Sequence, residues 1–292
     1  MKLKPAIFFM LTITGAVSQA QLLNNFHTEV RVMIDSDLRE QYAENNPDLV
    51  VQDIAVADVG EAHAQGQLDY GVNKVLAHFD AYNPDHPAEI MMADTLTQWI
   101  DEVTIDGGAL NGTLGTFHAS LRVSGSAHFS MTGAYSSPDA GLYGFWNSWI
   151  GTRTDGGASY LVDGWFGNYY SDGAGGIDYL GDDLNQPMTD VTLEFIYGQP
   201  FLLSGMMESY FDAQNPELLS GTVSGTMDFS HSAYWNGMRD FRDSNGNLVN
   251  IISLSSQSGV NWINAVPEPS TMIALFMGAV GLVSRRRRRS RT

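Results

Sequence analysis

The sequence contains no cysteine. Disulfides, zinc–thiolate sites, iron–sulfur clusters and cysteine nucleophiles are therefore all excluded. Exported domains need disulfides mainly when they are too small to build a hydrophobic core. With 292 residues, 43% of them hydrophobic, this chain is long enough to bury a sizeable core without them.

Basic residues are scarce in the central part of the chain. The whole sequence has 15 Lys and Arg against 33 Asp and Glu, a formal net charge of −18. Eight of these cations, but only one acidic residue, Glu268, lie in residues 1–20 and 265–292. Residues 21–264 therefore hold 7 cations against 32 acidic residues, a formal net charge of −25. Such a surface excludes nucleic acid, which needs clustered Lys and Arg, and it favours divalent cations and neutral partners.

Familiar catalytic motifs are also missing. The sequence has no Gly-x-Ser-x-Gly elbow, no His-Glu-x-x-His motif and no Gly-Lys-Ser/Thr phosphate loop. Its seven histidines are scattered, which is typical of surface or core positions. We therefore predict a non-enzymatic protein. A glycosidase needs only two carboxylates across a cleft, and 32 acidic residues leave that alternative open without indicating the pair.

The N-terminal residues have the pattern of a secretory signal peptide. Lys2 and Lys4 form a basic start, residues 6–17 are apolar, and Ser18-Gln19-Ala20 supplies small residues where a signal peptidase reads. We expect signal peptidase to cut after Ala20. Residues 1–20 are then removed, and residues 21–264 form the body of the exported protein.

The C-terminal residues form a second targeting segment. Pro267-Glu268-Pro269 is followed by an apolar run over residues 272–283 and then by an arginine cluster. As a helix, residues 271–284 would span about 21 Å, less than the ~30 Å hydrocarbon core of a bilayer. Arginines beside an apolar segment mark its cytoplasmic side. The body is therefore expected on the other side of the membrane.

These three parts, in this order, resemble the PEP-CTERM sorting signal of Gram-negative bacteria. The resemblance covers residues 265–292, about a tenth of the chain, and its arginine cluster comprises Arg285, Arg286, Arg287, Arg288 and Arg289. It implies that the inner membrane holds the exported protein transiently through the C-terminal helix. An exosortase then cuts near Pro267-Glu268-Pro269 and delivers the body to the cell surface or beyond. The alternative is an ordinary single-span anchor.

The body has the period-two alternation of half-buried β-strands. Residues 26–34 alternate strictly, and residues 62–82 suggest a long strand or hairpin whose phase changes near Asn73-Lys74. Further strands are expected at residues 49–59, 95–105, 115–123, 126–132, 191–197, 201–211, 221–229 and 248–254. The only helix candidate in the body is a weak one at residues 37–44. The pattern predicts a single all-β domain, a β-sandwich of jelly-roll type.

Aromatic residues are concentrated at the centre of the body. Ten of the 37 residues from 143 to 179 are aromatic, and they are interleaved with glycine and aspartate. Rings beside carboxylates and amides suit stacking and hydrogen bonding to sugars, while the alternative is that they fill the core. The candidate glycan-contacting residues are Trp146, Trp149, Trp165, Tyr169 and Tyr170.

Two segments carry weak calcium signals. Residues 173–181 partly resemble one turn of the glycine-rich calcium-binding nonapeptide repeat, but such sites need stacked repeats. A candidate structural calcium would lie near Asp172, Asp178, Asp182 and Asp183. Asp243, Asn245 and Asn247 have the spacing of a calcium loop, but the glycine and glutamate that complete it are replaced by leucines. A hairpin turn is the better interpretation there, and no other cofactor is expected.

The sequence thus leaves two functions open. The first is a non-enzymatic cell-surface or extracellular-matrix protein, sorted by exosortase and associated with exopolysaccharide. The alternative is a secreted glycan-binding or glycan-active protein on the same scaffold, because a fold alone does not decide between them.

Overall fold

The computed structural model describes residues 26–34, 37–45, 50–57, 60–81, 90–131, 141–154, 161–171, 177–181, 191–214 and 222–266. The expected signal peptide and the apolar helix of the sorting signal lie outside these residues. Within the described parts of the chain, no helix has the length and apolar character needed to cross a membrane. The one short helix described is a 3₁₀ turn, η2 (Gly108–Leu110).

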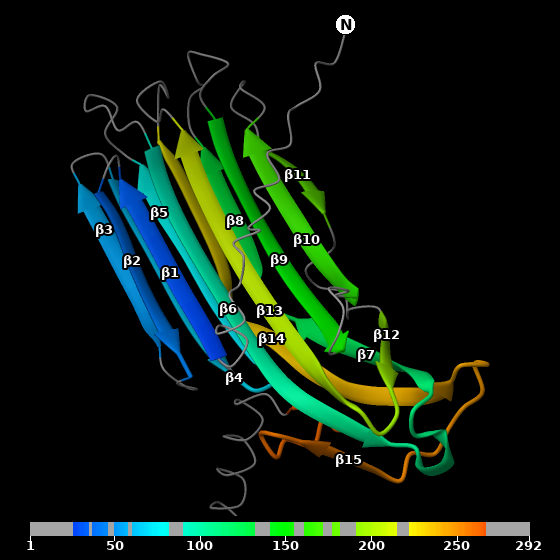
Figure 1. Ribbon diagram of the computed structural model, residues 1–292. Helices are drawn as coiled ribbons and strands as arrows, with labels where there is room; N and C mark the ends of the chain where they lie inside the picture. The colour runs from blue at the N-terminus through cyan, green and yellow to red at the C-terminus, as the bar shows by residue number, and fades with distance from the viewer. Residues whose placement is uncertain are drawn as a thin grey trace, which may run out of the picture.

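Two antiparallel sheets form the two layers of the molecule (Figure 1). Sheet A has the order β11-β10-β9-β13-β6-β1-β2, with β15 added beside β6. Its strands are β1 (Phe26–Ile34), β2 (Asp37–Glu44), β6 (Ile90–Asp106), β9 (Gly141–Thr154), β10 (Leu161–Ser171), β11 (Ile177–Gly181), β13 (Pro200–Gln214) and β15 (Ser253–Ser256).

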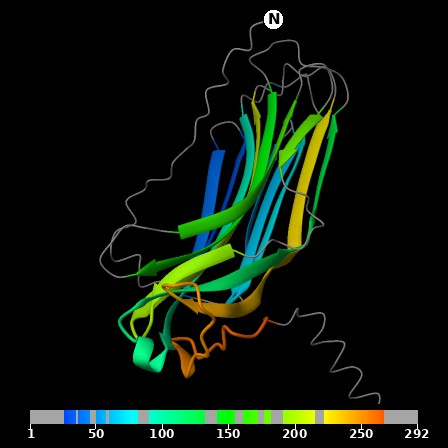
Figure 2. The same ribbon diagram turned by 90° about the vertical axis from the view of Figure 1, so that its right-hand side faces the viewer.

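Sheet B lies behind sheet A and has the order β12-β7-β14-β5-β4-β3, with β8 beside β14. Its strands are β3 (Val51–Ala57), β4 (Gly60–Asp69), β5 (Val72–Ala81), β7 (Leu114–Val123), β8 (Ser126–Met131), β12 (Val191–Ile196) and β14 (Val223–Asp243). Figure 2 shows that both layers curl along their length. The prediction of an all-β sandwich is therefore confirmed.

A single hydrophobic core fills the space between the sheets. It forms because alternate residues of each strand point inward: along β1, Phe26, Thr28, Val30, Val32 and Ile34 are buried, and the residues between them are half-buried. Close packing also requires small residues. A Cβ on Gly205 would lie 2.4 Å from a ring carbon of Trp99, so only glycine fits there.

The expected hairpin at residues 62–82 is present. Strands β4 and β5 pair along their whole length and are joined by a tight turn at Tyr70-Gly71. The turn lies slightly before the phase change expected near Asn73. Gly71 has φ +72°, a left-handed conformation that glycine adopts without strain.

Three sequence-based predictions need correction. Residues 37–44 are not a helix but strand β2, which pairs with β1 from His27–Glu44 to Ile34–Asp37. Most β2 residues are exposed on both faces, because β2 is an edge strand, and so the period-two signal is absent. The strand predicted at residues 248–254 also has other bounds. Leu248 makes only one isolated bridge, to Arg242, and the strand in this region is β15 (Ser253–Ser256).

The jelly-roll topology is the third correction. A jelly roll consists of eight strands arranged as two Greek keys. Here β3-β4-β5 and β9-β10-β11 are meanders, in which neighbours in sequence are also neighbours in one sheet. Period-two alternation identifies strands but carries no information about their order, which is why the sequence could not give this topology.

A segment that we call the strap, residues 257–266, closes the lower end of the sandwich. The Trp262 ring stacks on Trp99 with 4.7 Å between ring centroids and meets Trp235 edge-on at 5.5 Å. The Nε1 of Trp262 donates a hydrogen bond of 2.6 Å to buried Asp101, and the Trp262 carbonyl accepts one of 2.8 Å from Nε1 of Trp235. The N–H of Val266 donates to the carbonyl of Trp235 at 2.9 Å. The folded body therefore reaches the residue before Pro267.

We expect Trp262→Ala to lower the free energy of unfolding by about 3–5 kcal/mol, because it leaves a cavity and removes one of the hydrogen-bond donors of buried Asp101. Urea unfolding followed by circular dichroism measures this loss. Ile263→Ala is the matched control, since Ile263 is exposed, and a change within about 0.5 kcal/mol is expected. Equal stability of Trp262→Ala and the wild type would show that the strap does not contribute to the core.

Candidate functional site

The outer face of sheet A, which points away from sheet B, combines charged and aromatic side chains from neighbouring strands. The register places Arg31 of β1, Asp94 of β6, Tyr210 of β13 and Phe145 of β9 in one cross-strand row. Directly opposite residues in an antiparallel ladder share a face, so these side chains are neighbours. The adjacent rows add further polar and aromatic residues. We call the whole set the outer-face cluster: Arg31, Asp94, Tyr143, Phe145, Asn147, Glu208, Tyr210 and Asp212.

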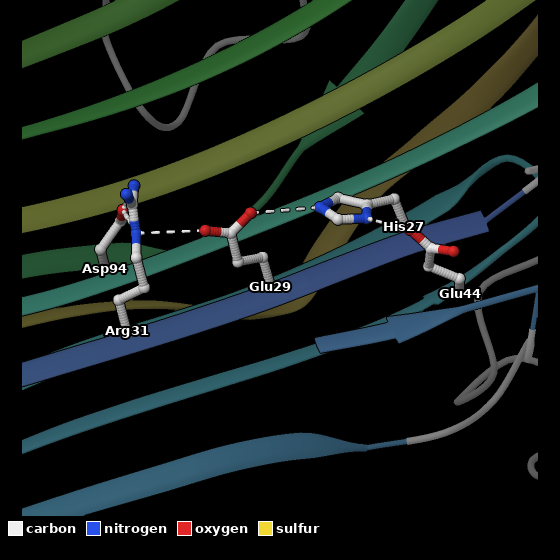
Figure 3. Close-up of polar contacts among 5 residues, drawn as sticks. All are labelled: His27, Glu29, Arg31, Glu44 and Asp94. Carbon is white, nitrogen blue, oxygen red and sulfur yellow. Dashed lines mark hydrogen bonds and ion pairs between the residues drawn. The ribbon is translucent and has the colours of Figure 1, made fainter. Parts of the chain in front are cut away.

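Charged groups along β1 form a chain of ion pairs beside this cluster (Figure 3). Arg31 holds the Asp94 carboxylate through two nitrogens, with Nε at 3.0 Å, and its Nε lies 3.3 Å from Glu29. Glu29 lies 3.2 Å from Nε2 of His27, whose Nδ1 is 4.0 Å from Glu44. The hydrogen bond to His27 lowers the pKa of Glu29. Each carboxylate in this chain therefore has a positive or protonatable partner.

Three carboxyl groups of the outer-face cluster are buried: Asp94 is 2% exposed, Glu208 7% and Asp212 9%. Burial raises the pKa of Asp94 to about 6, although the charge of Arg31 acts in the opposite direction. Burial, and then repulsion from Asp94, raises the pKa of Glu208 to about 7. Asn147 donates a hydrogen bond of 3.2 Å to Glu208. Glu208 is therefore partly protonated near neutral pH.

Aromatic rings lie beside these carboxyl groups. Phe145 and Tyr210 are stacked, with centroids 5.0 Å apart and planes 19° apart. Tyr143 packs against both rings, at 5.8 Å from Phe145 and 6.3 Å from Tyr210, and is 41% exposed. Burial raises the pKa of the Tyr210 hydroxyl, and Asp212 adds to that shift. We call these three rings the aromatic platform, and Tyr143 is its exposed member.

Trp146 and Trp149, the two residues of β9 that were predicted to contact glycans, lie on opposite faces of sheet A. Trp146 is 2% exposed and packs on Phe229 at 5.5 Å, so its ring belongs to the core. The expectation of a glycan contact at Trp146 is therefore wrong, because a buried ring offers no surface to a sugar. Trp149 is half-buried on the outer face, in the same β9 row of alternate residues as Phe145 and Asn147.

The other three predicted aromatic residues, Trp165, Tyr169 and Tyr170, lie in β10. The β10 backbone pairs with β9, and Tyr170 is directly opposite Tyr143. The side chains of these three residues lie outside the described set, so their part in glycan contact stays a prediction. The backbone register nevertheless brings β10 next to the aromatic platform.

The calcium predictions have separate outcomes. Asp172, Asp182 and Asp183 lie outside the described residues, and of Asp178 only the backbone, in β11, is described. That calcium site stays a prediction. In the loop after β14, the Asp243 carboxylate accepts hydrogen bonds from Asn245 N and Asn247 N, both at 2.9 Å, and from Asn247 Nδ2 at 3.0 Å. The carboxylate thus closes a turn, as the hairpin interpretation predicted.

Sequence reasoning missed Arg31, Asp94, Glu208 and Tyr210. A usable signal was present in β13, where Glu208, Tyr210 and Asp212 occupy alternate positions. Alternation places such residues on one face. It does not indicate which strand lies beside β13, and so Asp94 and Arg31 could not be added to the set.

Comparison with known proteins identifies the C-terminal segment. A search of curated proteins found no match to the chain. Residues 265–289 match the model of the PEP-CTERM protein-sorting motif. The segment marks the chain as an exported protein sorted to the cell surface, with an exosortase as its processing partner. Residues 265–289 are therefore a PEP-CTERM sorting motif, as Pro267-Glu268-Pro269 and the arginine cluster indicated.

The raised pKa of Glu208 predicts that the free energy of unfolding decreases as pH rises. Its pKa lies at about 7 in the folded state, against an ordinary value of 4.5. The native state therefore binds more protons than the unfolded state between these values. The contribution of Glu208 to stability is complete below about pH 4.5 and is lost as pH rises through about 7.

We expect Glu208→Gln to reduce this loss by about 1–3 kcal/mol, because the amide stays neutral at every pH. Urea unfolding at about pH 5 and about pH 8 measures the difference. Asp94 contributes a smaller loss of stability of the same sign at lower pH, so the stability of Glu208→Gln still decreases somewhat as pH rises. Glu194→Gln, at an exposed position of β12, is the control. An identical pH profile for wild type and Glu208→Gln would contradict the assignment.

Proposed function

We propose that the body is a non-enzymatic cell-surface module that binds neutral or cationic glycans, such as exopolysaccharide, through the outer face of sheet A. The observation that carries this proposal is the platform of Tyr143, Phe145 and Tyr210 beside the Asp94, Glu208 and Asp212 carboxyl groups. The sorting motif implies delivery to the cell surface, where the protein would meet such a ligand.

The chemistry of the face suits sugars. An exposed tyrosine ring such as Tyr143 can stack on the apolar face of a sugar, and its hydroxyl can form hydrogen bonds to sugar hydroxyls. The half-buried Asn147 amide supplies a further donor and acceptor. A formal net charge of −25 over residues 21–264 repels acidic polysaccharides, so the ligand is neutral or cationic.

The burial of the carboxyl groups favours binding over hydrolysis. A glycosidase needs two carboxyl groups that reach opposite sides of the bond to be cut. Asp94 and Glu208 are almost fully buried, and each has a protein partner, Arg31 and Asn147. In this arrangement they position the rings above them and make little direct contact with a ligand.

A glycan-active enzyme is the second candidate, and the raised pKa of Glu208 is the observation that favours it. A carboxyl group with a pKa near 7 is suited to general acid catalysis, and Asp94 would be its charged counterpart. Incubation with the polysaccharide and analysis of reducing ends distinguishes the two. New reducing ends that disappear in Glu208→Gln would establish the enzyme and overturn the non-enzymatic proposal.

Binding is tested with the double variant Tyr143→Ala/Trp149→Ala. We expect its affinity for exopolysaccharide of the producing cells to fall at least about tenfold, a change of about 1.4 kcal/mol. Surface-immobilised polysaccharide and a titration of purified protein give this affinity. Tyr42→Ala is the control, because Tyr42 is an exposed tyrosine on edge strand β2. Unchanged affinity in the double variant would remove the glycan-binding face.

We also propose that the inner membrane holds the protein until exosortase cuts at or after Pro267. The strap supports this position, since Val266 and Trp262 are hydrogen-bonded into the body. Intact-mass analysis of protein recovered from the cell surface should show Val266 present and Arg285 to Arg289 absent. Retention of the arginines, or a mature chain that ends before Trp262, would contradict the proposal.

A further inference from the structure

The outer face of sheet B carries a group of ligating side chains that has no role in the function proposed above. Glu61 lies on β4, and His78 and Asp80 lie on β5. The register places Glu61 directly opposite Asp80 and His63 directly opposite His78. Residues two positions apart on a strand share a face. The hairpin therefore presents two carboxylates and two imidazoles as a compact square.

Three of these side chains converge. The Nε2 atom of His78 is 3.3 Å from a carboxylate oxygen of Asp80 and 3.8 Å from one of Glu61. One ligand atom from each residue lies within 4.8 Å of the others. Ligands at about 2.1 Å from a tetrahedral zinc ion are about 3.4 Å from one another. The three atoms are therefore close to the spacing that such an ion requires.

A neighbouring strand fixes the orientation of the histidine. The Nδ1 atom of His78 lies 2.8 Å from Oγ1 of Thr226 on β14, which is directly opposite in the ladder. When Nε2 binds a metal ion, Nδ1 carries the proton and donates this hydrogen bond. Metal-binding histidines usually have such a partner at the second nitrogen, because it fixes the tautomer and the ring plane.

Solvent reaches the three side chains, and a fourth candidate ligand lies beside them. Glu61 is 47% exposed, Asp80 40% and His78 26%. Within the described part of the chain, the Nε2 atom of His63 has no hydrogen-bond partner. A metal ion could therefore enter from solvent, with water or His63 in the remaining position.

We propose that Glu61, His78 and Asp80 form a binding site for a divalent transition-metal ion of the zinc type on the outer face of sheet B. An imidazole ligand favours such an ion over calcium or magnesium, which take oxygen ligands in larger number. Two carboxylates balance its charge, and the negative surface of the body concentrates cations near the site. The ion connects β4 to β5 and stabilises this hairpin.

The proposal is tested by calorimetric titration of ZnCl₂ into EDTA-stripped protein. We expect one equivalent of zinc to bind, and His78→Ala to weaken this binding at least about tenfold. Asp80→Asn should weaken it too, with the fold unchanged because Asp80 is exposed. His118→Ala, on β7, is the control and should bind as the wild type does. Zinc binding that is unaffected by His78→Ala and Asp80→Asn would overturn the proposal.

Two further measurements identify the ion and its effect. Zinc should raise the melting temperature of the wild type and not that of His78→Ala, since an ion bound only to the folded state stabilises it. Co²⁺ should give the intense d–d absorption bands of a tetrahedral site in the wild type and not in His78→Ala. Calcium that competes with zinc at equal concentration would overturn the assignment to a transition metal.

Discussion

The packing of Trp262 between the two sheets is the interaction on which the remaining structure depends. Its ring stacks on Trp99 of sheet A and meets Trp235 of sheet B edge-on, and Asp101 accepts the indole N–H. A buried aspartate is costly unless it is hydrogen-bonded, and the strap supplies those bonds from Ser258 N as well as from Trp262. The strap and the sandwich therefore stabilise each other.

This closure has a consequence for sorting. Because the strap belongs to the core, the folded body continues to Val266 and includes the first two residues of the matched sorting motif, residues 265–289. Cleavage before the strap would remove Trp262 and expose Asp101, whereas cleavage after Val266 leaves the body intact.

The two sheets use their inner faces for packing, which leaves their outer faces for function. On sheet A, the buried carboxyl groups and the stacked rings lie in the same cross-strand rows. On sheet B, Glu61, His78 and Asp80 are more open to solvent. Both sets consist of residues from neighbouring strands, because a β-sheet brings side chains together across strands more closely than along them.

Local patterns in the sequence predicted much of the strand content. Strict alternation gave β1 at its observed bounds, and it also indicated the β4-β5 hairpin. The same reasoning failed for β2, because an edge strand that is exposed on both faces has no alternation to detect. It also left open whether Trp146 contacts a glycan or fills the core, since a tryptophan on a strand has the same neighbours in sequence whether it points inward or outward.

The sequence by itself determined the destination and the charge of this protein. The sorting motif is read as a continuous segment, and the separation of the basic ends from an acidic body is a matter of composition. Only the tertiary structure decided which residues act together. Arg31 and Asp94 are 63 positions apart, yet they form an ion pair because β1 and β6 are neighbours in sheet A. Strand order arises from the packing of the whole core, and no local pattern encodes it.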